Sequence, residues 1–146
     1  MQASIRYAII SIRMNVTLIA LPAAALYLLG GLSTGLRLFA GEDDWRPSRH
    51  LGLLLGFAGL LLHGLMLYYE LFTSGGLNLG FFNAVSLAAW TVAGLLLVSA
   101  LSKPIENLAI LALPLAAITV LLDLRFPGSH LLSEHSGWAL RVHLLS

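Results

Sequence analysis

Long uncharged apolar runs dominate the chain, and short polar segments separate them. A helix needs roughly 20 apolar residues to cross the hydrocarbon layer of a bilayer. Four runs approach or reach that length, and lipid offers the backbone no hydrogen-bond partners, so we predict that each run is a membrane-spanning helix. The predicted spans cover about 14–36, 51–70, 81–101 and 105–124.

A fifth apolar segment begins at Trp138, and the chain stops at Ser146. A helix over 138–146 is too short to span a membrane, so we expect the chain to be truncated; a short amphipathic tail lying at the interface is the alternative. The predicted fold class is all-α: a polytopic transmembrane helix bundle with four spans plus the start of a fifth, in a single domain over residues 1–146.

The composition agrees with this prediction. Apolar residues make up 58% of the chain and charged residues 10%, and the mean hydropathy is +0.88. A soluble domain carries about 25% charged residues, so charge this sparse cannot cover a solvated globular surface. The eight basic and seven acidic residues nearly cancel, which argues against a nucleic-acid partner. The absence of cysteine excludes disulfides, thiolate metal sites and cysteine nucleophiles.

Basic residues in the loops predict the orientation, because they favour the cytoplasmic side. The side that holds residues 37–50 has four basic residues: Arg37, Arg46, Arg49 and Lys103. The other side has three: Arg6, Arg13 and Arg125. If translation starts at Met14, only one of these three remains. We therefore predict that residues 37–50 are cytoplasmic and that residues 123–137 lie outside.

The second predicted span carries small and polar residues at helical spacing on one face: Gly52, Gly56, Gly59, His63, Met66 and Glu70. An ionisable side chain within a span usually faces the bundle interior and marks a site. One interpretation is that His63 offers a neutral imidazole to a metal, above all a haem iron. The alternative is a helix-packing seam, in which the glycines admit a neighbouring helix and His63 hydrogen-bonds it.

The third predicted span has a polar face of its own, formed by Asn83, Ser86, Trp90 and Gly94. For this face we favour hydrogen bonds between helices over contact with a ligand. Two acidic residues, Glu70 and Asp123, fall at predicted span ends, where we expect water to solvate them.

The segment after the fourth span contains three residues that superficially suggest a zinc site: His130, Glu134 and His135. Their spacing in H-L-L-S-E-H matches neither of the helical zinc motifs H-E-x-x-H and H-x-x-E-H, so we predict neither a hydrolase nor catalytic residues. His143 differs, because it stands within the apolar segment W-A-L-R-V-H-L-L-S that starts at Trp138. At the outer interface its imidazole could ligate a haem.

Three parts of the sequence stand out together. The first is G-L-N-L-G-F-F-N-A-V-S-L-A-A-W, over Gly76–Trp90. The second is His63 followed by Glu70 in the second span, and the third is S-G-W-A-L-R-V-H-L-L-S, over Ser136–Ser146. These parts resemble the cytochrome c assembly family, and within it the YpjD-like bacterial inner-membrane proteins related to the haem-handling subunit CcsA. The resemblance covers roughly residues 51–146, the family's N-terminal half.

The resemblance implies a membrane protein that handles haem through histidines within the membrane and on its outer face. His143 matches the family's first external haem-ligand histidine, near Trp138, and His63 matches a membrane-embedded histidine. The implied location is the bacterial inner membrane, and the implied partners are haem, the lipid bilayer and other cytochrome c assembly subunits. The family's tryptophan-rich segment and second external histidine are not in this chain, so we do not expect the chain alone to ligate haem to apocytochrome c.

A second functional hypothesis needs no haem: an accessory or structural membrane protein that supports a transporter or another membrane complex through its glycine-lined helix face. Substrate transport by the chain itself is less favoured, because no pair of broken-helix repeats is evident. An unfinished fifth segment leaves apolar helix faces without neighbours, which predicts self-association or association with further helices.

Overall fold

The computed structural model describes residues 2–40, 47–73, 76–78, 80–103, 106–126 and 131–132. Within these residues lie four long helices: α1 (Gln2–Phe39), α2 (Arg49–Leu71), α3 (Phe81–Ser102) and α4 (Glu106–Arg125). Each contains a segment long and apolar enough to cross a membrane, at Asn15–Phe39, Arg49–Leu71, Phe81–Ser102 and Asn107–Arg125. The predicted all-α bundle is confirmed, and the protein is a multi-pass membrane protein.

The helices are longer than the predicted spans at several ends. α1 already begins at Gln2, because no glycine or proline interrupts residues 2–21. It also continues through Pro22 to Phe39, as spanning helices can. The fourth helix extends through Asp123 to Arg125, into the segment predicted to be a loop. The predicted fifth segment, 138–146, lies outside the described residues.

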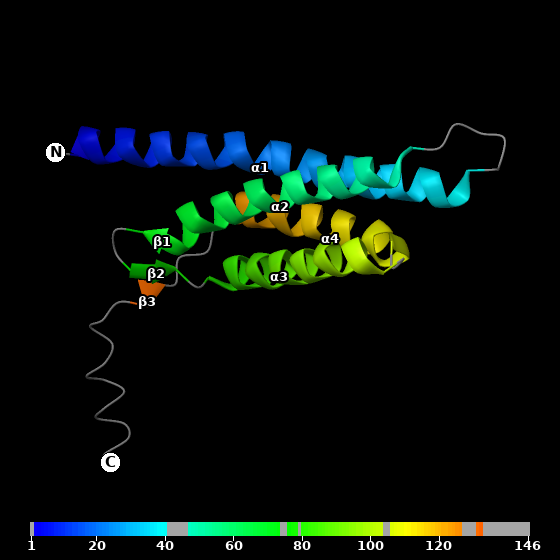
Figure 1. The fold of residues 1–146 in the computed structure, drawn as a ribbon. Coiled ribbons are helices and arrows are strands. Elements are labelled where there is room, and N and C mark those ends of the chain that lie inside the picture. Colours follow the sequence, from blue (N-terminus) through cyan, green and yellow to red (C-terminus); the bar gives the residue numbers. More distant parts are fainter. Residues whose placement is uncertain are drawn as a thin grey trace, which may run out of the picture.

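The four helices pack as antiparallel neighbours (Figure 1). α1 contacts α2 and α4, and α3 contacts the same two helices. α2 and α4 therefore lie between α1 and α3, and side chains from all four helices can meet in the interior. In Figure 1 the N-terminal part of α1 extends past the other helices.

Small residues make this close packing possible. Half of the buried core cluster is alanine, at positions 20, 24, 93, 109, 116 and 117, and small residues are typical of helix interfaces within membranes. The glycines of α2 are packed more tightly still. A Cβ built on Gly56 would lie 2.7 Å from Leu97 Cδ2, and one on Gly59 would lie 3.0 Å from Tyr27 Cδ1. The glycine face of α2 is therefore filled by neighbouring helices.

Different elements close the two ends of the bundle. At one end, the chain after α2 forms a small antiparallel sheet from β1 (Phe72–Thr73), β2 (Gly76–Asn78) and β3 (Leu131–Leu132), where the sequence had predicted only loops. At the other end, the Arg49 guanidinium donates hydrogen bonds to the carbonyls of Ala100 and Lys103 at the end of α3. The Ser48 hydroxyl caps α2 by accepting a hydrogen bond from the Leu51 amide at 3.2 Å.

Candidate functional site

A buried polar cluster lies inside the bundle and takes one side chain from each helix: Tyr27, His63, Ser86 and Asp123. All four are fully buried, each with 0% of its surface exposed. Polar groups in the interior of a membrane protein are costly and mark functional sites more often than polar groups elsewhere. These four residues, together with Glu70, form the candidate site and are called the polar cluster below.

His63 lies at the centre of the polar cluster and uses both of its ring nitrogens. Nε2 is 2.9 Å from the Ser86 hydroxyl oxygen, and Nδ1 is 3.3 Å from the Tyr27 hydroxyl oxygen. The rings of Tyr27 and His63 meet edge to face, with their centroids 5.8 Å apart. A neutral imidazole has one donor and one acceptor nitrogen, so the two hydroxyls satisfy the ring completely.

Helix packing explains why these partners reach His63. Gly59 lies one turn before His63 on the same face of α2, and its missing side chain lets α1 approach closely enough for Tyr27 to meet the imidazole. On the other side, Trp90 joins α3 to α2 through a hydrogen bond of 2.8 Å from its indole Nε1 to the Leu60 carbonyl. Ser86 precedes Trp90 by one turn and faces the same helix, so its hydroxyl is held against His63.

The geometry agrees with the predicted helix-packing seam on α2 and with the predicted hydrogen bonds between α3 and its neighbour. The polar face of α3 makes two contacts of this kind, from Ser86 to the His63 ring and from Trp90 to the Leu60 carbonyl. Asn83 from the same face is also buried. The spacing of polar residues on each span was therefore sufficient to predict which face of each helix packs against a neighbour.

The prediction that water solvates Asp123 is wrong. Asp123 is 0% exposed, because α4 continues past it to Arg125 and turns its side chain into the bundle. Its carboxyl group faces Glu70 and Ser86, without reaching the geometry of a directed hydrogen bond. Glu70 is half-buried near the end of α2.

A sequence signal for the burial of Asp123 did exist. It continues a set of α4 residues spaced four, three, four and three apart: Ala109, Leu113, Ala116, Val120 and Asp123. The first four of these residues belong to the buried core, and this spacing keeps residues on one face of a helix. Asp123 could thus have been placed on the buried face from the sequence.

The remaining predicted site residues, His143 and Trp138, lie outside the described residues, as do His130, Glu134 and His135. In the part of the chain that the structure describes, no group of three or more His, Asp or Glu residues could hold a metal ion. An iron at His63 would have to replace Ser86 or Tyr27 at a ring nitrogen. The surroundings of His63 in this conformation therefore do not fit a haem.

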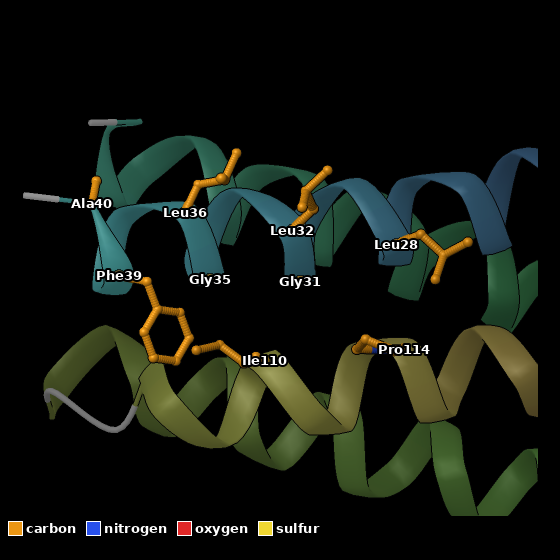
Figure 2. Close-up of a pocket in the computed structure, with 9 residues that line it drawn as sticks. All are labelled: Leu28, Gly31, Leu32, Gly35, Leu36, Phe39, Ala40, Ile110 and Pro114. Carbon is orange, nitrogen blue, oxygen red and sulfur yellow. The ribbon is translucent and has the colours of Figure 1, made fainter. Parts of the chain in front are cut away.

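An apolar groove lies between α1 and α4, away from the polar cluster (Figure 2). It has a volume of about 760 Å³ and is lined by Leu28, Gly31, Leu32, Gly35, Leu36, Phe39, Ala40, Ile110 and Pro114. A Cβ on Gly31 would lie 3.0 Å from Pro114 Cδ, which shows how closely the two helices approach at this point. These lining residues include no titratable side chain, so the groove offers apolar contact but no ligand for a metal.

Comparison with known proteins gives no match: no family model, curated protein or solved structure is similar to the chain. The assignment to the cytochrome c assembly family therefore stays a prediction that rests on the residues quoted above.

Replacing Trp90 with phenylalanine tests the link between α3 and α2. The change keeps an aromatic ring and removes the hydrogen bond from Nε1 to the Leu60 carbonyl. We expect the free energy of unfolding in detergent to fall by about 0.6 kcal/mol, the average for a hydrogen bond between membrane helices. Thr91→Val is the control, because the exposed Thr91 hydroxyl bonds only the Leu87 carbonyl of its own helix. Equal effects of the two changes would contradict the prediction.

Proposed function

We propose that the chain is a haem-handling membrane protein of the cytochrome c assembly type. The observation that carries this proposal is that the family-like residues of the described region meet in one place. His63 and Glu70 come from α2, and Ser86 and Trp90 come from the family-like stretch Gly76–Trp90. His63, Ser86 and Glu70 belong to the polar cluster, and Trp90 borders it. The His63–Ser86 and Trp90–Leu60 hydrogen bonds join α2 to α3.

The proposal assigns the haem iron to His143, with Trp138 beside it. Imidazole is a common axial ligand of haem iron. The bound haem would be coordinated through its iron, and it would be the group that the protein delivers. His63 is not assigned to the iron, because Tyr27 and Ser86 already bond both ring nitrogens. The four-helix bundle then serves as the membrane anchor that positions the external segment, and the polar cluster belongs to its interior.

The proposed location is the bacterial inner membrane. The segment between α1 and α2 is proposed to face the cytoplasm, and the segment after α4 to face the periplasm. The ends of α2 and α4 lie beside the small sheet, so the sheet would be on the periplasmic side with His143. Other cytochrome c assembly subunits are the proposed protein partners.

A second candidate function is a haem-free accessory membrane protein that supports a transporter or another complex. The closed environment of His63 favours it, since no ring nitrogen is open to a ligand. The tight glycine seam of α2 also favours it, because Gly52, Gly56 and Gly59 serve helix packing.

A visible spectrum of the purified protein distinguishes the two candidates. The protein is produced with ample haem supply, purified in mild detergent and examined for the Soret band of haem. We expect a band that His143→Ala abolishes and that His63→Gln retains. His50→Ala serves as the control, because His50 is exposed at the start of α2, and it should leave the band unchanged.

Two results would contradict the haem proposal as stated. A colourless protein under all these conditions would favour the haem-free accessory function. A band that disappears in His63→Gln but persists in His143→Ala would show that the iron was assigned to the wrong histidine. The unfolding free energy of each variant, measured in the same detergent, shows whether a lost band reflects lost folding.

A further inference from the structure

A second, smaller groove opens between α2 and α3, at the end of the bundle that carries the sheet. It has a volume of about 210 Å³ and is lined by Gly64, Leu67, Tyr68, Leu71, Phe72, Leu87 and Trp90. A Cβ on Gly64 would lie 3.1 Å from Trp90 Nε1, so the two helices touch at this point. Tyr68 and Phe72 nevertheless stay 58% and 61% exposed. The described part of the chain therefore leaves this apolar surface, called the α2–α3 groove below, uncovered.

The sheet places the end of β3 close to the α2–α3 groove. Phe72 pairs with Leu77, and Leu77 pairs with Leu132, so these three residues form one row across the sheet. Neighbouring strands lie about 4.8 Å apart, which puts the backbone of Leu132 about 10 Å from that of Phe72. Phe72 itself lines the groove. The chain that follows β3 therefore starts beside the groove.

The residues after β3 match the groove in length. Five residues, S-E-H-S-G, separate Leu132 from Trp138, and serine and glycine are common in turns. The six steps from Leu132 to Trp138 span up to about 20 Å, twice the distance from β3 to Phe72. The apolar segment 138–146 follows and is about 14 Å long as a helix. The part of α2 that lines the groove, from Gly64 to Leu71, is about 12 Å long.

Helical spacing gives the segment 138–146 an apolar face that suits the groove. Trp138, Val142 and Leu145 are four and three residues apart, so they share one face of a helix. His143 follows Val142 at about 100° around the helix axis, farther still from Trp138, and is not part of this face. A helix docked through the three apolar residues therefore leaves the imidazole of His143 on another side.

The groove between α1 and α4 is not within similar reach of this segment. Its lining on α1 runs from Leu28 to Ala40, toward the end of the bundle that lies opposite the sheet (Figures 1 and 2). The α2–α3 groove is the one that adjoins the sheet, because β1 begins at Phe72, directly after α2.

We propose that the segment 138–146 forms a short helix that docks in the α2–α3 groove, with Trp138, Val142 and Leu145 packed against Tyr68 and Phe72. Van der Waals packing of this kind drives helices together in lipid. Docking fixes where His143 stands relative to the bundle. The proposal rests on the groove, the sheet register and the spacing of the segment, and it requires no haem.

Cysteine cross-linking of the whole chain, prepared without haem in lipid nanodiscs, tests the docking, and the chain has no cysteine of its own. Tyr68→Cys combined with Val142→Cys should form a disulfide within one chain. Docking brings the two positions into the range in which a disulfide closes, with Cα atoms about 4.4–6.8 Å apart. Leu144→Cys in place of Val142→Cys is the first control. Leu144 lies about 200° from Val142 around the helix, so most of the cross-link should be lost.

Leu21→Cys combined with Val142→Cys is the second control. Leu21 is 52% exposed, close to the 58% of Tyr68. It also lies at nearly the same level of the bundle. Tyr27 of α1 meets His63 of α2, and in these antiparallel helices Leu21 is six residues before Tyr27 and Tyr68 is five residues after His63. We expect no cross-link from Leu21, because α1 does not line the α2–α3 groove.

Three results would overturn the proposal. Equal cross-linking from Tyr68 and Leu21 would show that the segment has no fixed place on the bundle. No cross-link from either position would leave the groove to lipid chains, and disulfides between two chains would assign it to a second copy. Each reduced variant is unfolded in detergent beside the unmodified protein to show that its fold is intact. Phe72→Cys combined with Trp138→Cys is a second pair that reports the same docking if the first pair lowers stability.

Discussion

Replacing Gly59 with valine is expected to lower the free energy of unfolding by about 1–3 kcal/mol, the usual cost of overpacking a well-packed core. The first added carbon would lie 3.0 Å from Tyr27 Cδ1, 3.2 Å from Tyr27 Cγ and 3.3 Å from the Ala23 carbonyl oxygen. Tyr27 is fully buried and bonded to His63, so its ring has no free space to move into. Reversible unfolding in mixed detergent micelles measures the change.

Gly94→Val provides the matched control for this prediction. A Cβ on Gly94 meets only Leu60 side-chain atoms, at 3.6 and 3.7 Å, which are ordinary contact distances. Since surface substitutions away from special features stay within about 0.5 kcal/mol, we expect little change for this half-buried position. A similar loss of stability for both variants would show that the effect comes from valine in a helix rather than from the contact between α1 and α2.

Replacing His63 with alanine is expected to be the most destabilising change in the polar cluster, by about 3 kcal/mol. The substitution leaves a cavity between three helices and removes the partners of the Tyr27 and Ser86 hydroxyls, both of which are fully buried. A buried polar group without a hydrogen-bond partner destabilises the fold by its full desolvation free energy. The same unfolding measurement in detergent applies.

His50→Ala is the control for the His63 prediction, because it removes the same ring from an exposed position at the start of the same helix. We expect its unfolding free energy to match that of the unmodified protein. Equal stability of His63→Ala and His50→Ala would mean that the two hydroxyls find other partners and that the polar cluster does not hold the helices together.

The sequence predicted the spans well because hydrophobic length in lipid is a strong physical constraint. It also predicted the faces on which His63 and Ser86 lie, since helical spacing fixes which residues share a face. The partner from α1 was missed. Tyr27 stands in an apolar run, and only the packing of α1 against the glycines of α2 brings its hydroxyl to the imidazole.

Two other features depended on tertiary structure. Asp123 was expected in water because it falls at the predicted end of the fourth span, whereas it lies on the buried face of α4, which continues to Arg125. The small sheet was missed because β3 is only two residues long and pairs with β2 across a large separation in sequence. Local patterns carry little information about such pairing, which depends on where α2 and α4 end relative to each other.

The length of α1 has a consequence for the membrane surface. A helix of 38 residues is about 57 Å long at 1.5 Å per residue, nearly twice the hydrocarbon thickness of about 30 Å. With Asn15–Phe39 in the bilayer, the turns before Asn15 extend past the other helices (Figure 1) and beyond the hydrocarbon layer. These turns contain Arg6 and Arg13, and arginines that flank a spanning helix are among the residues that anchor it at the membrane interface. We therefore expect this part of α1 to contribute to the depth and tilt of the helix in the bilayer.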